Sequence, residues 1–542
     1  MGTKQYDSAT DLLTFSRASG GTALRKISYS NDELVTNGTF DTNASGWVGN
    51  NSHYSPTIES QRLKVITGAS GQWNYAQTSV SGLTIGKMYR FQASSFAGTT
   101  DSHRISLGTV SGQSYDIFGQ GVGYNVNQTV DRTFTATTTV VYVSLQNTDG
   151  VDGSTTFFDN ISIKEVLFDQ ADGTLQLFNH GNNMPRIEYD ATGAVKGLLI
   201  EEARTNGILT SEVAPTNYFG GLTKSVDNSV VSPAGGNNVE KFTLSNANDY
   251  HYVGNHHNIS TGTGNSTYSI FAKGSGHNLI RLRMSNVSGI PSCDFDLSTG
   301  QKQVTSSSDS SVTGSIESIG NGWWRCAITY DAVKLNPYAS VFLIDAMDAS
   351  SLQFQGDGTS GVYVWGSQYE TGAFPTSYIP TTGAAATRAR DIAEIPTSAF
   401  GYNNDAGTVV CEFDSAALYG STIFTLVVGQ ATHGMTAIIY PYHRVSYQVV
   451  TGGGIQVNSN FDAYPTASQV SKVATVYAKD DFAAVLNGGA VATDTAGSVP
   501  PVSTLKLGVY WGAGDFFMSG HIKSIQYYPR RLTNTQLQEL TT

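Results

Sequence analysis

Apolar and polar residues alternate over many short stretches of this chain. The apolar residues Val141, Val143 and Leu145, for example, alternate with Tyr142 and Ser144. A period of two is typical of a β-strand with one buried face. Turns rich in Gly, Asn and Ser separate such stretches, as they do in β-sandwiches. The pattern predicts an all-β chain of tandem β-sandwich (jelly-roll) modules joined by extended connectors.

Changes in this pattern divide the chain into six predicted segments. They are an extended N-terminal segment (1–30), a first sandwich (31–166), a connector (167–206), a second sandwich (207–380), a linker rich in small residues (381–392) and a third sandwich (393–542). Each sandwich has the size of an ordinary domain.

Two local signals stand out in the third sandwich. The sequence Asn-Gly-Gly at 487–489 joins two apolar runs and predicts a hairpin turn. Residues 531–540 are the one convincing helical stretch, with Thr533 as its candidate N-cap.

The composition narrows the range of partners. Only 14% of the residues are charged, and 43 acidic residues outnumber 31 Lys and Arg, which gives a net charge of −12. A nucleic acid would meet repulsion rather than a basic patch, and no apolar stretch approaches the ~18 residues of a membrane span. We therefore expect no nucleic-acid partner and no membrane insertion. The acidic surface is compatible with neutral, hydroxyl-rich ligands, although solubility alone is the simpler explanation of the charge.

The cysteines indicate a reducing compartment. Cys293, Cys326 and Cys411 cannot all pair, and their spacing does not match a metal site. We expect buried free thiols, which fits folding in the cytoplasm. Residues 1–15 contain no apolar signal core, which also predicts cytoplasmic synthesis.

Three separated stretches resemble a known pattern. LTFSRAS (13–19), PRIEY (185–189) and GLLIEEARTN (197–206) resemble a pattern that is common in bacteriophage tail-fibre and head-fibre proteins. In this chain the first sandwich interrupts the pattern, inserted between about Tyr29 and Leu167. The stretches GNGWWRCAIT and VYVWGSQYETGAFPTSYIPTTGAAATRARD are similar to the module that follows in such proteins.

This resemblance implies a structural adsorption protein of a phage virion, a tail fibre, head fibre or spike that acts as the receptor-binding protein. Its partners would be a host cell-surface glycan and, through the N-terminal segment, other virion proteins. It would be a homo-oligomer, with a trimer favoured, made in the host cytoplasm and located in the virion.

Two of the sandwiches carry further resemblances. The first resembles jelly-roll carbohydrate-binding modules through LVTNGTFDTNASGW and FFDNISIKEV. The third resembles concanavalin/laminin-G-like sandwiches through VATVYAKDDFAAVLNGG and GHIKSIQYYPRRLTNTQLQEL. Both imply a lectin-like fold more firmly than a particular ligand, since such sandwiches host many functions.

Aromatic residues are the candidate ligand contacts. The C–H face of a sugar ring stacks on an aromatic ring, and nearby amides or carboxylates bond to the hydroxyls. Trp47 and Trp365 are expected in cores, and Trp323 and Trp324 on opposite faces of one strand. For every candidate, ordinary packing in a sheet or between subunits is the alternative. The candidate carbohydrate-binding residues are Trp73, Tyr75, Tyr115, Trp324, Tyr440, Tyr442 and Trp511.

The resemblance to jelly-roll modules also implies a structural metal. Such modules often hold a calcium ion through an early acidic residue and one in the last strand, and Asp41 and Asp159 stand at the matching positions. Calcium takes about six to eight oxygen ligands, so two side chains do not complete a site. A structural, non-catalytic calcium ion is therefore a hypothesis, and we expect no required cofactor.

No catalytic constellation is evident. Glycosidic cleavage needs paired carboxylates at a fixed separation, and pairs such as Asp480 and Asp481 are more simply turn residues. His256 and His257 lack a third ligand at metal spacing, and neither a P-loop nor a G-x-S-x-G elbow is present. We expect a binding protein without catalytic residues. Two alternatives stay open, a capsid or tail decoration protein that uses the sandwiches as structural modules, and a polysaccharide-degrading spike enzyme.

Overall fold

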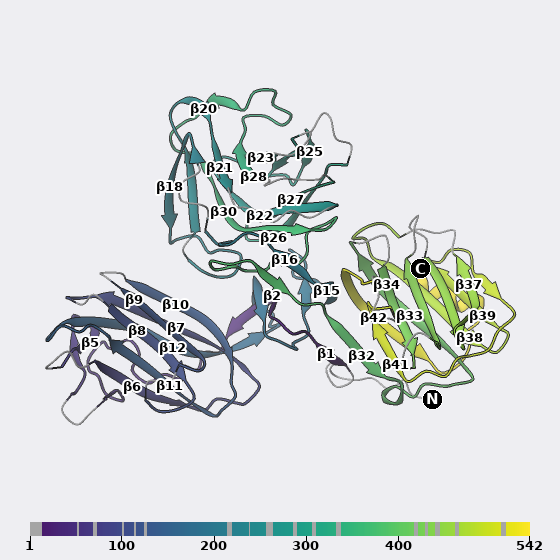
Figure 1. The fold of residues 1–542 in the computed structure, drawn as a ribbon, viewed down its shortest axis with the longest axis horizontal. Coiled ribbons are helices and arrows are strands. Elements are labelled where there is room, and N and C mark those ends of the chain that lie inside the picture. Colours follow the sequence, from purple (N-terminus) through teal and green to yellow (C-terminus); the bar gives the residue numbers. More distant parts are fainter. Residues whose placement is uncertain are drawn as a thin grey trace. The chain divides into compact units, whose positions relative to one another are not determined.

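The computed structural model describes residues 13–50, 54–68, 73–99, 102–112, 115–123, 127–213, 219–237, 239–255, 264–285, 290–305, 311–331, 338–416, 421–428, 432–439, 445–460, 465–510 and 516–542. Within these residues nearly all regular structure is antiparallel strand (Figure 1). The predicted all-β fold class of tandem sandwiches is confirmed. The chain divides into a larger unit, Met1–Arg25 with Leu175–Thr542, and a smaller unit, Lys26–Thr174.

The smaller unit is a sandwich of two antiparallel sheets. The first sheet consists of β10 (Gln128–Thr135), β7 (Met88–Ala97), β12 (Thr155–Phe168) and the end of β2 (Gly21–Tyr29), with β5 (Arg62–Ile66) and β4 (Thr57–Glu59) beside β12. The second consists of β3 (Val48–Gly49), β6 (Asn74–Ser81), β11 (Val140–Asn147), β8 (Ser102–Gly108) and β9 (Phe118–Gly123).

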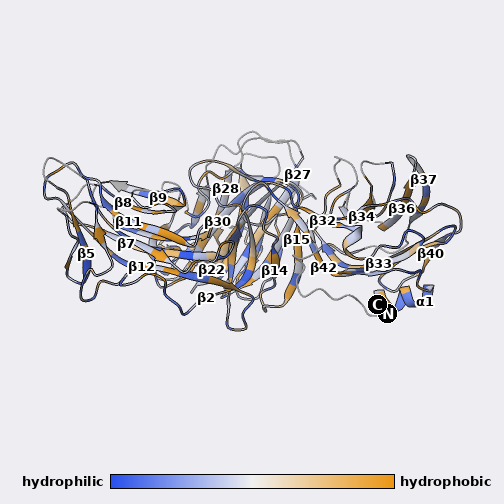
Figure 2. Ribbon diagram, turned by 90° about the horizontal axis from the view of Figure 1, so that it is seen from below, coloured by the Kyte–Doolittle hydropathy of each residue, from blue (hydrophilic) through white to orange (hydrophobic). Residues whose placement is uncertain are grey.

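The core of the smaller unit lies between these sheets. Phe91 and Ile163 of the first sheet pack with Ile105, Val143 and Leu145 of the second, and all five are fully buried. Polar residues alternate with these, as the interleaved hydrophobic and hydrophilic segments along the strands show (Figure 2). The strand predicted from Val141, Val143 and Leu145 is therefore confirmed, with that face buried.

We expect residues 26–174 to fold when they are expressed alone. The unit has its own core, and its two ends meet, since the amide of Asp169 donates to the carbonyl of Lys26 at 3.1 Å. Domains with adjacent termini tolerate being inserted or excised. Circular dichroism should show a β-rich spectrum and a cooperative thermal transition. A fragment that ends before β12 is the control and should stay unfolded, because β12 pairs with β2, β5 and β7; a coil spectrum for 26–174 itself would contradict the expectation.

The larger unit contains two further sandwiches. One sheet of the second sandwich consists of β17 (Phe219–Gly220), β21 (Tyr252–Asn255), β28 (Tyr338–Leu343), β23 (Leu279–Ser285), β24 (Ser292–Asp296) and β25 (Lys302–Val304). The other consists of β18 (Leu222–Asp227), β19 (Val239–Leu244), β30 (Gly361–Thr371), β22 (Asn265–Ser275), β27 (Trp323–Asp331) and β26 (Thr313–Gly320). A separate ribbon pairs β20 (Asn248–Tyr250) with β29 (Gln353–Gln355).

The third sandwich recruits strands from distant parts of the chain. One sheet consists of β1 (Thr14–Ser16), β32 (Ile392–Pro396), β41 (Thr504–Leu507), β34 (Ser421–Val427), β35 (Gly434–Ile439), β36 (Val445–Thr451) and β37 (Gly454–Asn460). The other consists of β14 (Ile187–Tyr189), β15 (Val195–Ile200), β42 (Gly520–Tyr528), β33 (Ala406–Ser415), β38 (Ser471–Ala478), β39 (Phe482–Leu486) and β40 (Ala492–Asp494). The N-terminal segment and the connector thus each add strands to this sandwich.

The remaining elements are β13 (Thr174–His180), which pairs with β2, the two-stranded pair β16 (Arg204–Asn206) and β31 (Ala386–Arg388), and the short 3-10 helix η2 (Thr397–Ala399). The α-helix α1 (Asn534–Thr541) packs on the third sandwich through Leu537.

A second apolar cluster covers the outer face of the second sandwich. Trp323 and Trp365 of that face pack with Leu24, Leu177 and Tyr378, which come from the N-terminal segment, from β13 and from the stretch after β30. This packing explains why β30 is buried along nearly its whole length. Trp365 is 5% exposed, as predicted for a core residue.

The local signals of the third sandwich are confirmed. Thr533 caps α1, because its side chain accepts from the amide of Gln536, whose own side chain accepts from the amide of Thr533. Asn487 and Gly488 have φ of 49° and 66°, the left-handed values that a type I′ hairpin turn requires. The three cysteines are buried and unpaired.

Candidate functional site

Three of the candidate aromatic residues lie on one outer surface of the smaller unit. In β6, Ala76 is fully buried in the core, so Tyr75 points to the opposite face. Trp73 lies two positions before Tyr75 and so points to the same face, and it is 50% exposed. Tyr115 is 61% exposed, and its ring lies 5.7 Å from the guanidinium carbon of Arg104 on β8. These rings are accessible, as ligand contacts must be.

The strand register places polar groups in the row of Tyr75. Tyr75 lies opposite Gln146 of β11, and Gln146 lies opposite Arg104 of β8. Directly opposed residues have Cβ atoms ~4.5–5.5 Å apart. A phenol, an amide and a guanidinium therefore line up across three strands. We call this surface the aromatic face, and it consists of Trp73, Tyr75, Arg104 and Tyr115. Gln146 belongs to the same row but is only 1% exposed, and its amide donates to Ser106.

A glycine and a closed loop position Tyr115 over the sheet. A Cβ atom on Gly119 would lie 2.6 Å from the Cβ atom of Tyr115, so a larger residue there would displace the ring. The loop that carries Tyr115 is closed by Asp116, which accepts from the amide of Thr109 at 2.9 Å and from its hydroxyl at 2.6 Å. These contacts fix the backbone from which the Tyr115 ring projects.

The sequence did not reveal the polar residues in the row of Tyr75. Arg104 and Gln146 stand in ordinary strands, and their approach to Tyr75 depends on the register of β6, β11 and β8. The one signal available in the sequence was the alternation of side chains along each strand, which places Arg104 and Gln146 on the face opposite their apolar neighbours.

The other candidate aromatic residues lie elsewhere. Trp47 is 5% exposed, as predicted for the core. Trp323 and Trp324 do point to opposite faces of β27, but the outward ring is that of Trp323, and the second apolar cluster buries it. Trp324 is half-buried on the core side and packs near Gly300, which makes it a weaker candidate than Trp73. Three of the candidates lie outside the described residues, namely Tyr440, Tyr442 and Trp511.

Asp41 and Asp159 approach one another in the smaller unit. Burial raises the pKa of Asp159, the amide of Asn160 and the charge of Arg62 oppose that rise, and the charge of Asp41 adds to it. Thr39 donates to Asp41 at 2.7 Å. No cluster of three or more His, Cys, Asp or Glu suited to a metal occurs among the described residues. A calcium ion would therefore bind this pair and otherwise carbonyl, hydroxyl or water oxygens, and it stays a hypothesis.

Calcium should stabilise the smaller unit if this hypothesis is right. An ion that binds only the folded state adds about 2.7 kcal/mol at a hundred times its Kd, which raises the Tm by several degrees. Differential scanning calorimetry with calcium and with chelator would measure this shift in the transition of the smaller unit. Asp159→Asn should abolish the shift, and an unchanged Tm in the unsubstituted protein would refute the hypothesis.

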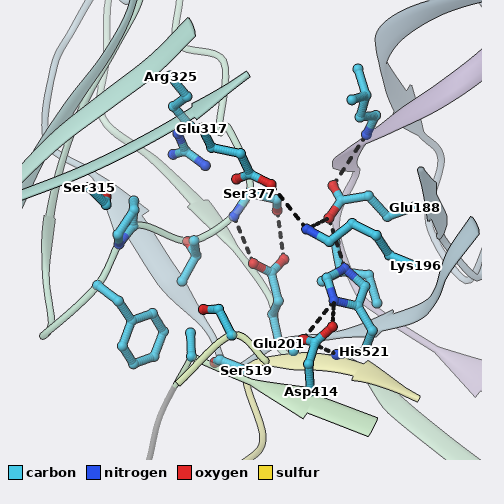
Figure 3. Close-up of a pocket in the computed structure, with 18 of the residues that line it drawn as sticks. Glu188, Lys196, Glu201, Ser315, Glu317, Arg325, Ser377, Asp414, Ser519 and His521 are labelled. Atoms are coloured by element: carbon cyan, nitrogen blue, oxygen red, sulfur yellow. Dashed lines mark hydrogen bonds and ion pairs between the residues drawn. The ribbon is translucent and has the colours of Figure 1, made fainter. Parts of the chain in front are cut away.

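The larger unit contains a cavity of about 640 Å³, which we call the charged cavity. Its walls come from strands β14 and β15, from β26 and β27 of the second sandwich, from β33 and β42 of the third, and from residues 373–378. Figure 3 shows Glu188, Lys196 and His521 on one side, with Glu317 and Arg325 across from them. This size is within the range of ligand-binding pockets, roughly 300–1,000 Å³.

His521 is held between two carboxylates at one wall of the charged cavity. Its Nε2 lies 2.8 Å from Glu188, and its Nδ1 lies 2.9 and 3.0 Å from the two oxygens of Asp414 (Figure 3). Burial would lower the pKa of His521, but the hydrogen bonds and charges of Asp414 and Glu188 outweigh it and raise the pKa to about 9. His521 is therefore an imidazolium at neutral pH and joins β42 to β14.

Lys196 spans the charged cavity. Its ammonium lies 3.2 Å from Glu317 on β26 and 3.5 Å from Glu188 on β14. Burial would lower the pKa of Lys196, yet the charges of Glu188 and Glu317 raise it well above its ordinary value. The lysine thus connects the second sandwich with the strands that join the third.

A buried ionic network lies behind the charged cavity. Asp391 accepts from Arg17 at 3.0 Å and from Arg186, and its Oδ2 lies 3.9 Å from Arg388. Glu201 lies 2.9 Å from Arg186 and 3.5 Å from Arg388. All five residues are at most 5% exposed. We call these five residues the arginine network.

The arginine network comes from the stretches that resemble phage fibre proteins. LTFSRAS supplies Arg17, PRIEY supplies Arg186, GLLIEEARTN supplies Glu201, and the stretch ending in TRARD supplies Arg388 and Asp391. These five charged residues of the pattern therefore form buried ion pairs within the larger unit and are not exposed for binding. Sequence reasoning did not predict this role.

The acids of the charged cavity are poorly suited to proton transfer. Burial would raise the pKa of Glu201, but the charges of Arg388 and Arg186 lower it to about 2. Burial would also raise the pKa of Glu188, but the hydrogen bond of His521 and the charge of Lys196 lower it well below its ordinary value. A carboxyl group that serves as a general acid needs a raised pKa, so Glu188 and Glu201 do not suit that role.

Comparisons with known proteins give the following. No protein-family model matches the chain, and no curated protein sequence matches it. Among solved structures, the chain is similar to a SAP-like pentraxin from Limulus polyphemus, with a TM-score of 0.22 and 15% identity over 26% of this chain and 73% of that one. It is also similar to the N-terminal CBM22-1-CBM22-2 tandem domain of a Paenibacillus barcinonensis protein, with a TM-score of 0.21 and 10% identity over 64% and 99%.

A third similar structure is the LG1-3 region of the laminin alpha2 chain, with a TM-score of 0.19 and 8% identity over 85% of this chain and 96% of that one. Scores of this size carry no functional argument. The described residues also contain no helix that is long and apolar enough to span a membrane.

Proposed function

We propose that this chain is a non-enzymatic adsorption protein of a phage virion that binds host-surface carbohydrate through the aromatic face. The observation that carries the proposal is the convergence of two exposed rings, those of Trp73 and Tyr115, with Tyr75 and Arg104 on one sheet surface. Exposed aromatic rings beside a guanidinium donor provide the stacking surface and a hydrogen bond for a hydroxyl-rich sugar ring.

The virion role is supported by the sequence pattern of the larger unit. The stretches that resemble phage fibre proteins build the arginine network, so the pattern corresponds to a folded framework in this chain. A virion displays many copies of such a protein. Copy number multiplies weak single-site binding, because linked sites raise the effective concentration.

Substitution of the two exposed rings tests the proposal. On a glycan array and on host cells, Trp73→Ala and Tyr115→Ala should each weaken binding about tenfold, equivalent to ~1.4 kcal/mol. Ile85→Ala is the matched control, since this apolar residue of the same unit is 62% exposed and lies outside the aromatic face. Unchanged binding in both ring variants would contradict the proposal, and a folded protein that binds no glycan would favour the decoration role.

The absence of catalysis is part of the proposal. The lowered pKa of Glu188 and of Glu201 supports it, because neither carboxyl group carries the proton that the general acid of glycosidic cleavage must donate. Incubation with host capsule or lipopolysaccharide should release no oligosaccharide. Release that survives Glu188→Gln and Glu201→Gln would point to catalysis elsewhere in the chain.

A further inference from the structure

The sheet that carries the aromatic face contains a single charged side chain. In the five strands β3, β6, β11, β8 and β9, Arg104 is the one Lys, Arg, Asp or Glu. The other sheet of the smaller unit carries charges of both signs, and these form ion pairs such as Arg90 with Asp131 and Lys64 with Glu59. The strands of the aromatic face therefore contribute one positive charge and no negative charge, although the whole chain has a net charge of −12.

The guanidinium of Arg104 has no counter-ion within the part of the chain that the structure describes. It forms no ion pair and no hydrogen bond there, and the side chain is half-buried rather than sealed. Asp116, the acid of the loop that carries Tyr115, instead accepts from the amide and the hydroxyl of Thr109. The guanidinium carbon lies 5.7 Å from the ring centroid of Tyr115, which is itself exposed. A ligand that contacts this ring can therefore also reach an unpaired cation.

The neighbouring strand leaves space beside Arg104. Arg104 lies opposite Gly121 of β9, and a Cβ atom on Gly121 would lie 3.7 Å from Nε of Arg104. A side chain at position 121 would thus begin in contact with the guanidinium and occupy the space next to it. Gly121 is exposed, so this side of Arg104 is open to solvent.

A carboxylate is the acceptor that matches such a group. The planar guanidinium presents paired N–H donors to the two oxygens of a carboxylate, and the opposite charges strengthen both bonds. The net charge of the chain opposes an anion only at long range, because salt screens charges beyond ~8 Å at physiological ionic strength. Within that distance the unpaired Arg104 favours an anionic ligand. The exposed rings of Trp73 and Tyr115 provide the stacking surface for its sugar rings.

We propose that the aromatic face binds acidic carbohydrate, a glycan whose sugars carry a carboxylate, as uronic acids do. The carboxylate bonds to Arg104, and the rings of Trp73 and Tyr115 contact the sugars. Tyr75 and Arg104 stand two strands apart, which is ~10 Å and wider than one sugar ring, so the ligand is an oligosaccharide. This inference rests on the proposed function, because it specifies the ligand of the same face.

An array of uronic acid oligosaccharides, each printed beside its methyl ester, tests the proposal on the full chain. Oligomers of glucuronic, galacturonic and mannuronic acid are the probes, and esterification removes the charge while it leaves the rings and their hydroxyls in place. At least one acid should bind about tenfold tighter than its ester, the factor expected of one charge-assisted hydrogen bond. The preference should shrink as the salt concentration rises.

The array separates this inference from the proposed function. Equal binding of acids and esters, or binding of neutral glycans alone, would overturn the assignment to acidic carbohydrate and leave the proposed function standing. A folded chain that binds no glycan of either kind would contradict both.

Three variants place the preference at Arg104. Arg104→Gln should abolish the preference for acid over ester without lowering the Tm, because the guanidinium has no ion pair to lose, and Arg104→Lys should restore part of it. Trp73→Ala should instead weaken acid and ester alike. Arg132→Gln is the matched control, since this exposed arginine of β10 lies on the other sheet and its removal changes the net charge equally. A preference that survives Arg104→Gln, or that disappears in Arg132→Gln as well, would refute the assignment.

Discussion

Replacing Asp391 with alanine is expected to destabilise the larger unit by about 3–5 kcal/mol. Asp391 is fully buried and accepts from Arg17, from Arg186 and from the amide of Glu201. Its removal leaves three buried guanidinium groups with Glu201 as the one remaining acid of the arginine network. Breaking a buried pair costs far more than the pair contributes, because the partner keeps its desolvation penalty without its counter-charge.

Denaturant unfolding followed by tryptophan fluorescence would measure this effect. Asp405→Ala is the matched control, since this aspartate of the larger unit is exposed, and we expect it to change stability by less than about 0.5 kcal/mol. The transition of the smaller unit should be unchanged in both variants. A loss below about 1 kcal/mol for Asp391→Ala, well short of the roughly 3–5 kcal/mol expected for a broken buried pair, would mean that water reaches the arginine network.

The stability of the larger unit is expected to fall by on the order of 3 kcal/mol as the pH rises from 6.5 to above 9, through the titration of His521. The folded-state pKa of His521 is raised to about 9, whereas in the unfolded chain it takes its ordinary value of 6.5. Between these values the folded protein holds a proton that the unfolded chain has released. The stabilisation is complete below pH 6.5 and is lost as the pH passes through 9.

Thermal unfolding at a series of pH values would test this dependence. His521→Gln should flatten the curve between pH 6.5 and 9, because the titrating group is gone. His433→Gln is the control, since this histidine of the same sandwich contacts Thr432 and Gly452 rather than a carboxylate, and the decline should persist in it. A decline that persists in His521→Gln would assign it to another group.

Part of the candidate site could be predicted from the alternation of side chains between the two faces of a strand. This alternation placed Tyr75 and Trp73 on a face opposite the buried Ala76, and it separated Trp323 from Trp324. It could not say what covers each face. Trp323 points outward from its sheet as one of the pair had to, yet residues of the N-terminal segment and of β13 pack over it. Exposure is decided by what packs on a face, and that packing partner stands more than a hundred positions away in the chain.

Local sequence predicts the partners of the charged residues even less well. Arg17 and Asp391 are 374 positions apart, and neither stretch alone distinguishes a buried ion pair from two solvated charges. The resemblance to phage fibre proteins grouped these stretches into one pattern, but it did not predict that their charged residues form a buried network. His521 and Glu188 likewise meet because β15 pairs with β42, which no local pattern predicts.

The amino-acid sequence by itself determined the all-β class, the buried face of strands such as β11, the turn at Asn487 and the cap at Thr533. These features depend on side-chain period, backbone φ and neighbours within a few residues, so a short stretch of sequence is enough to predict them. The tertiary structure alone decided the row of Tyr75, Gln146 and Arg104, the arginine network and the charged cavity. Each of these depends on which strands become neighbours and in what register, and that choice is made by the burial of whole sheets rather than by any single stretch of chain.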